Sequence, residues 1–135
     1  MNLVEPIPAA WCDEVVRALS KGTTPNVRWS FRAQQDWQQF GLPYQAHELL
    51  IRTLRQPGIW GERVTTMIPL PNPPKGAGSQ AVYGFLCPHP LGGQKPLYAK
   101  IGLFANEVTL DIFSLHIDLS GELTRCIAQA QKKRT

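Results

Sequence analysis

The sequence predicts an α+β fold: N-terminal helices, a curved, mainly antiparallel four-stranded sheet, and a C-terminal helix. Two observations support this prediction. Apolar residues recur at helical spacing before Gly58 and alternate at strand spacing between residues 60 and 117. The helices come first and most strands follow, a segregation typical of α+β proteins rather than of alternating α/β folds.

Three helices are expected before Gly58, over residues 9–20, 31–40 and 43–56. Ser30 can cap the second helix, because a serine hydroxyl accepts a hydrogen bond from the first free backbone N–H groups. Gly41 can end that helix, and Pro57-Gly58 ends the third. Residues 26–29 are expected to be extended.

Four strands are expected after Gly58, over residues 60–70, 80–87, 97–104 and 107–117. A loop rich in proline and glycine, residues 69–78, follows the first of these strands. Ala105-Asn106 is interpreted as a two-residue hairpin turn between the last two. A final helix over residues 120–133 ends in a basic run.

The chain has 135 residues, a length typical of one domain, residues 1–135. Within it, residues 1–25 are interpreted as a helical N-terminal extension and residues 118–135 as a C-terminal helix with a basic tail. The net charge of +4 permits a polyanionic partner such as RNA without requiring one. No signal peptide and no apolar stretch long enough to span a membrane is found, so a cytoplasmic protein without membrane contact is expected.

Three cysteines are widely spaced, and they form no Cys-x-x-Cys pair: Cys12, Cys87 and Cys126. They are interpreted as thiols in a reducing compartment, and no metal site or cofactor is expected. Two histidines, His47 on a helix and His89 in a loop, are expected to be solvated.

Polar side chains interrupt the predicted strands where apolar ones are usual: Gln80, Tyr98, Lys100 and His116. An amide, a phenol, an ammonium and an imidazole are what a metal-free ribonuclease needs, since it must position a ribose hydroxyl, move protons and neutralise a phosphorane. The competing interpretation is structural: a sheet-face tyrosine, surface cations and a histidine at a strand end.

With a two-residue turn, Tyr98 and Lys100 share the face away from the core, and Lys100 lies opposite Asp111. The structural alternative to a site role for Lys100 is a cross-strand ion pair with Asp111. Strict alternation turns His116 toward the core. For His116 to lie beside Tyr98, a bulge or a strand end is needed between Phe113 and His116.

Short motifs occur in a definite order after the predicted helices. These are Thr65-Thr66, Gln80-Ala81-Val82-Tyr83, Leu97-Tyr98-Ala99-Lys100-Ile101 and Ser114-Leu115-His116. Their order resembles that in the MqsR (motility quorum-sensing regulator) family of toxin ribonucleases, which have a RelE-like fold. The resemblance runs from Val27 to His116, about two thirds of the chain.

The resemblance implies a toxin that cuts mRNA, free or on the ribosome, without a metal and leaves a cyclic phosphate. It also implies a cognate antitoxin protein as partner. Gln80 and Tyr98 match catalytic residues of the family, and His116 stands at its last lysine. Glu62 stands at its first lysine, with Arg63 beside it as a substitute charge.

The same motifs place Lys100, Tyr83 and Glu62 as candidate RNA-binding residues. Two other interpretations remain open at this stage. The chain could be a non-catalytic module that binds protein or RNA through the same fold, or an inhibitor of phage or immunity type. The altered positions Glu62, Arg63 and His116 are what keep these interpretations open.

Overall fold

The computed structural model describes residues 3–22, 27–64, 80–92, 95–104 and 109–134. The elements follow the order β1 (Leu3–Pro6), α1 (Ala9–Ser20), β2 (Val27–Trp29), α2 (Phe31–Gln38), α3 (Pro43–Leu54), β3 (Trp60–Val64), β4 (Gln80–Cys87), β5 (Leu97–Phe104), β6 (Thr109–Ile117) and α4 (Glu122–Arg134). The α+β class predicted from the sequence is confirmed. None of the described helices is long and apolar enough to cross a membrane.

The sheet has six strands in the order β1-β3-β4-β5-β6-β2, so the four-stranded prediction was wrong. The predicted run β3 to β6 forms the centre of the sheet, with antiparallel neighbours throughout. β1 pairs antiparallel with β3, and β2 pairs parallel with β6. Residues 26–29 were predicted to be extended, which β2 confirms. Strands of three or four residues are too short to show alternation, so neither edge was predicted as part of the sheet.

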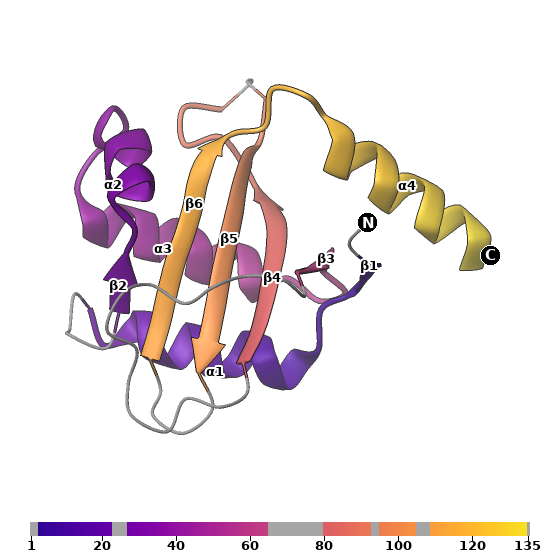
Figure 1. The fold of residues 1–135 in the computed structure, drawn as a ribbon, viewed down its shortest axis with the longest axis horizontal. Helices are drawn as coiled ribbons and strands as arrows, with labels where there is room; N and C mark the ends of the chain where they lie inside the picture. The colour runs from indigo at the N-terminus through magenta and orange to yellow at the C-terminus, as the bar shows by residue number, and fades with distance from the viewer. Residues whose placement is uncertain (1–2, 23–26, 65–79, 93–94, 105–108, 135) are drawn as a thin grey trace.

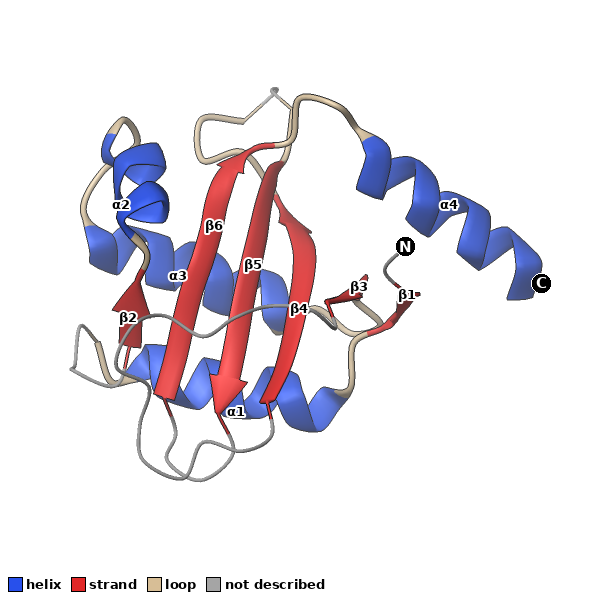
Figure 2. Ribbon diagram, in the orientation of Figure 1, coloured by secondary structure: helices blue, strands red, loops and turns tan. Residues whose placement is uncertain are grey.

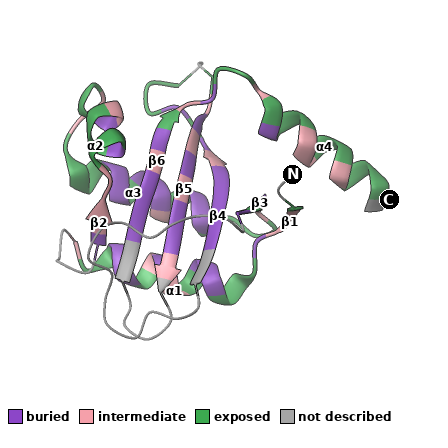
Figure 3. Ribbon diagram, in the orientation of Figure 1, coloured by how far each residue is buried: buried purple, intermediate pink, exposed green. Residues whose placement is uncertain are grey.

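Figures 1 and 2 show how the helices are arranged around this sheet. α1 and α3 cover one face, called here the inner face, while α2 lies beside β2 and β6 and α4 lies on the side of β1 and β3. Figure 3 shows that burial follows this arrangement, with the central strands buried and α4 mostly exposed. The N-terminal segment is therefore an integral part of the fold, since α1 forms part of the core.

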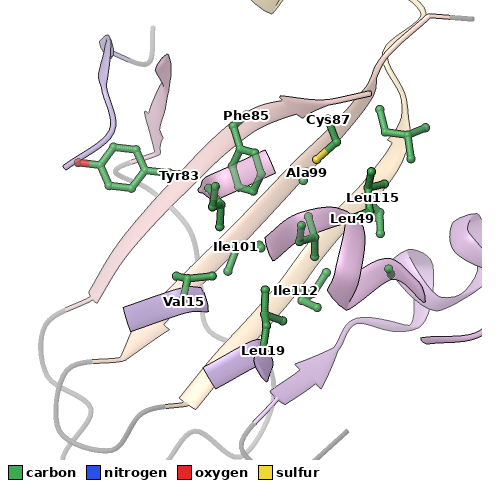
Figure 4. Close-up of a cluster of buried hydrophobic side chains, with 14 of the residues drawn as sticks. Val15, Leu19, Leu49, Tyr83, Phe85, Cys87, Ala99, Ile101, Ile112 and Leu115 are labelled. Carbon is green, nitrogen blue, oxygen red and sulfur yellow. The ribbon is translucent and has the colours of Figure 1, made fainter. Parts of the chain in front are cut away.

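The core lies between the inner face and helices α1 and α3 (Figure 4). Its fully buried side chains include Val15, Leu50, Phe85, Leu97, Ala99, Ile101, Ile112 and Leu115. Local signals agree with the helix boundaries: Ser30 Oγ accepts a hydrogen bond of 3.0 Å from the N–H of Ala33, as predicted for the start of α2.

The pairing of β5 with β6 differs from the prediction by two residues. Leu103 pairs with Leu110, whereas a turn at Ala105-Asn106 requires Leu103 to pair with Val108. The turn itself lies outside the described residues. The register is irregular between the Lys100–Ser114 and Ile101–Ile112 pairs, so Phe113 is the extra residue of a β-bulge. A bulge or strand end was predicted between Phe113 and His116, and the bulge lies at Phe113, the first residue of that range.

The prediction that Lys100 lies opposite Asp111, where the two could form an ion pair, was wrong. Lys100 pairs with Ser114, and Asp111 pairs with Gly102. Asp111 is fully buried and accepts two hydrogen bonds from Arg28, of 2.8 Å from Nε and 2.9 Å from Nη2. Because β2 runs parallel to β6 with Arg28 level with Asp111, this pair joins the edge strand to the sheet.

Candidate functional site

Tyr98 lies on the outer face of the sheet, the face opposite α1 and α3. Its ring crosses Gly84 of the neighbouring strand β4, where any Cβ would overlap the phenol. The hydroxyl reaches the next strand and donates a hydrogen bond to the carboxylate of Glu62 in β3. Glycine at position 84 is thus what allows three strands to bring a phenol and a carboxylate together.

His116 lies directly beside Tyr98. The two residues are register partners, and their ring centroids are 5.6 Å apart with planes at 35°. The bulge at Phe113 shifts the alternation of β6 by one residue. Without that shift His116 would point inward. The imidazole is exposed, and Nδ1 lies 3.0 Å from the carbonyl oxygen of Ile117. If Nδ1 donates in that contact, Nε2 is the ring nitrogen left for other partners.

A cleft of about 890 Å³ opens over these three residues, between the sheet and α4. We call it the Tyr98 cleft. Its wall on α4 includes side chains spaced along one helix face, Leu123, Cys126, Ala130 and Lys133, and α4 also contributes Glu122 and Gln129. The remaining lining residues are Leu3, Val4, Glu62, Tyr98, His116, Asp118 and Ser120.

The electrostatics of the cleft keep Tyr98 in its protonated form. Burial raises the pKa of Tyr98 well above its ordinary value, and the hydrogen bond and charge of Glu62 and the charge of Asp118 raise it further. Asp118 is itself 8% exposed, and its Oδ1 accepts a hydrogen bond of 3.3 Å from Ser120. Tyr98 is therefore a hydrogen-bond donor in this cleft rather than a phenolate.

Two of the predicted site residues lie on the other face of the sheet. Arg63 pairs with Tyr83 and is exposed, while Glu62 next to it points outward. Tyr83 is 3% exposed: its ring packs 5.0 Å from that of Trp11, and its hydroxyl donates 3.3 Å to Glu5. Neither Arg63 nor Tyr83 joins the Tyr98 cleft.

Gln80 lies on β4 and Lys100 on β5, and they differ in their distance from Tyr98 along the sheet. Gln80 is the first residue of β4, six residues before Leu86, the register partner of Tyr98. At about 3.3 Å per residue, its backbone lies about 20 Å from that partner. Lys100 is closer, two residues beyond Tyr98 on the outer face, and pairs with Gly84. Thr65-Thr66 lies outside the described residues.

The sequence interpretation missed two features of the cleft. Asp118 follows β6 directly, and its proximity to Tyr98 depends on how the chain turns into α4. The wall formed by α4 carries Cys126, which lies in no motif, and Lys133, which belongs to the predicted basic tail but was not placed at the site. A carboxylate two residues after His116 was the only local signal available, and such a residue is common at strand ends.

Comparisons of the chain with family models, curated proteins and solved structures gave no match. The resemblance to MqsR toxins therefore rests on the short motifs alone. In the described part of the chain, no group of three or more His, Cys, Asp or Glu residues is arranged to hold a metal ion. Fold and site together define an α+β protein with a phenol, a carboxylate and an imidazole gathered at one cleft on its sheet.

Proposed function

We propose that this protein is a metal-independent endoribonuclease that acts in the Tyr98 cleft. The observation that carries the proposal is that Glu62, Tyr98 and His116 come from three strands and line one cleft. In this proposal the carboxylate is the general base, the imidazole is the general acid, and the protonated phenol between them is a hydrogen-bond donor.

The reaction proposed is attack of a ribose 2′-hydroxyl on the neighbouring phosphate. Glu62 takes the proton of the 2′-hydroxyl as the bond from O2′ to phosphorus forms. Protonated His116 gives a proton to the 5′-oxygen as the bond from phosphorus to that oxygen breaks. The products are a 2′,3′-cyclic phosphate and a 5′-hydroxyl, so atoms and protons balance without a further reactant.

Tyr98 is proposed to turn its O–H from Glu62 to a phosphate oxygen when RNA binds. Its raised pKa suits that role, because a neutral phenol donates to an oxyanion that a phenolate would repel. Lys100 on the same face and Lys133 on the α4 wall supply positive charge near the phosphates. Arg63, Tyr83 and Gln80 have no part in this mechanism.

The resemblance to MqsR extends the proposal to biology. On that basis the protein is a toxin of a toxin–antitoxin system that cuts mRNA in the cytoplasm, and an antitoxin protein covers the cleft. Expression of the chain alone is then expected to arrest growth, and His116→Ala is expected to relieve the arrest.

The direct test is cleavage of a short single-stranded RNA by the purified protein in EDTA. We expect cleavage with a cyclic phosphate end, and a loss of about a hundredfold or more in Glu62→Gln, the usual scale for a general base. Arg63→Gln, next to Glu62 but on the inner face, is the matched control and should keep its activity. Cleavage that needs magnesium, or a fully active Glu62→Gln, would contradict the mechanism.

A second function is favoured by the acidic side of the cleft. Glu62, Asp118 and Glu122 all line it, and carboxylates repel the phosphates of RNA. A non-catalytic module that binds a basic segment of a partner protein, such as an inhibitor of phage or immunity type, would use the same charges. Absence of RNA cleavage together with tight binding of a lysine-rich partner would favour this alternative.

A further inference from the structure

A second cavity lies at the opposite edge of the molecule from the Tyr98 cleft, between β2, α2 and α3. It measures about 480 Å³, within the range of small-molecule sites. We call it the His47 pocket. It is lined by Val27, Trp29, Gln34, Trp37, Gln38, Gly41, Leu42, Pro43 and His47.

The walls of the His47 pocket are aromatic and apolar, with amides on α2. Trp37 is 3% exposed and is fixed by a hydrogen bond of 2.9 Å from its Nε1 to the carbonyl oxygen of Leu42. Trp29 is half-buried and offers a ring face. Gln34 and Gln38 are exposed and lie one turn apart on α2, so both amides belong to the same side of the pocket. Gln34 Nε2 donates one hydrogen bond of 3.3 Å to the carbonyl oxygen of Trp29, which leaves its Oε1 and its second N–H for a ligand.

His47 contributes a buried polar group to this pocket. It is 3% exposed, and its ring is stacked on Trp29 with centroids 6.1 Å apart and planes at 15°. Neither ring nitrogen makes a well-aligned hydrogen bond within the described part of the chain, and the backbone of Leu19 offers only a poorly aligned one. Burial lowers the pKa of His47, and the nearby backbone of Leu19 offsets this only in part, so the imidazole is neutral.

We propose that the His47 pocket binds an uncharged nitrogen heteroaromatic ring of the nucleobase class. The ring would lie against Trp29 and be recognised at its edge by Gln34 and Gln38. Amides offer a donor and an acceptor side by side, the pattern that pairs with an adenine edge. A ring nitrogen of the ligand can also satisfy His47 after a rotation of the imidazole, whereas a hydrocarbon would leave it unpaired.

The uncharged lining of the pocket argues against a charged ligand. None of its nine lining residues is Asp, Glu, Lys or Arg. An isolated phosphate or carboxylate would therefore be desolvated there without a counter-charge. The inference does not depend on the proposed ribonuclease, because the Tyr98 cleft shares no lining residue with this pocket.

The four tryptophans provide a built-in test. Adenosine would be titrated into the full-length protein while the indole N–H signals are followed by NMR. Trp29 and Trp37 line the pocket and should shift with saturation, while Trp11 and Trp60 lie outside it and should not. The double variant Gln34→Ala/Gln38→Ala should weaken binding about tenfold. Gln35→Ala/Gln39→Ala, at an exposed position of α2 and at the exposed residue that follows its last turn, is the matched control.

Further ligands show whether the bound ring comes from a nucleoside or from RNA, and they define the results that would overturn the proposal. Tighter binding of a short oligoadenylate than of adenosine identifies a base subsite for RNA, and equal affinities identify a nucleoside site; both support the proposal. A lack of saturable shifts with either ligand would overturn it. Binding of toluene as tight as adenosine, equal losses in both double variants, or binding of N-acetyltryptophanamide alone would also overturn it, the last in favour of a protein partner.

Discussion

The outer face of the sheet has two ends that differ in exposure although both carry polar residues. At one end Asp111, Val82 and Phe113 are buried, with exposures of 0%, 2% and 8%. At the other end Tyr98 is half-buried and His116 is exposed beside a cleft. The acidic residue of the closed end has its charge matched by Arg28, whereas the polar groups of the open end face a space large enough for a ligand.

Both ends use a glycine to let a ring lie flat across the strands. Tyr98 crosses Gly84, and Phe113 lies against Gly102. The outcome differs because the phenol carries a hydroxyl that reaches Glu62, while the phenyl ring joins an apolar cluster with Val64 and Val82. Polar residues in strands therefore do not identify a site by themselves; their exposure and partners do.

Removing a charge at the closed end should have the largest effect on stability. Asp111→Ala leaves Arg28 without its bidentate partner, and breaking a buried pair in this way costs about 3–5 kcal/mol. Urea unfolding followed by circular dichroism measures this loss. Asp13→Ala, an exposed carboxylate on α1, should change the free energy of unfolding by less than about 0.5 kcal/mol. A loss in Asp111→Ala as small as in that control would show that the closed end is not held by this pair.

At the open end, a substitution should mainly lower the rate of RNA cleavage rather than the stability. His116→Ala should lower RNA cleavage about a hundredfold or more, with an unfolding free energy close to that of the parent, because the imidazole is exposed. His116→Lys should restore part of the rate and flatten the pH dependence near neutrality, since lysine does not titrate there. A fully active His116→Ala would refute the role of this residue.

Periodicity predicted more of the sheet than of the site. Alternation placed Tyr98 and Lys100 on one face, and the need to bring His116 beside Tyr98 required the bulge that the structure contains. Alternation could not place Arg63, whose proposed role assumed that neighbouring residues share a face, which strands do not allow. The ion partner of Asp111 was missed because Arg28 lies on a three-residue strand far away in the sequence.

The histidines show where local sequence is least informative. His47 and His89 were expected to be solvated, yet they are 3% and 7% exposed. His47 is buried because α3 packs its ring against Trp29, and His89 because its loop folds onto Phe40, with ring centroids 5.2 Å apart. Both contacts join segments distant in sequence, so neither a helix period nor a loop composition predicts them.

The two glycines allow a matched pair of substitutions. Gly102→Ala would place a methyl group 2.8 Å from Phe113 and 3.2 Å from Val82, inside an enclosed cluster, and should cost about 1–3 kcal/mol of stability. Gly84→Ala would displace the end of the Tyr98 side chain, which can swing toward the cleft. We expect a smaller loss of stability there and about a tenfold loss of cleavage, from the misplaced hydroxyl.

Unfolding curves and cleavage rates for both variants decide this comparison. Asp111→Ala, a stability variant that leaves Tyr98 untouched, serves as the reference for activity per folded molecule. Equal losses of cleavage in folded Gly84→Ala and Gly102→Ala would remove the distinction between an open and a closed end.

The smallest expected effect is on the labelling of the three cysteines. Cys12 and Cys87 lie in the core, and Cys126 lines the Tyr98 cleft. Burial raises the pKa of the Cys12 thiol to about 11 and that of Cys87 to about 12, so both are almost entirely protonated at pH 8 and shielded from reagents. Cys126 is half-buried on the wall of the Tyr98 cleft. A thiol reagent should therefore label one cysteine quickly and two only on unfolding.

Labelling at Cys126 should also lower cleavage several-fold, because the attached group occupies space beside Tyr98 that RNA needs. Cys126→Ala is the control: it should lose the fast labelling phase, keep its activity, and become insensitive to the reagent. A short RNA should slow the labelling of Cys126 in the parent protein. If RNA leaves that labelling rate unchanged while cleavage proceeds, the substrate does not enter the cleft beneath α4, and the open end of the sheet is not where the chemistry takes place.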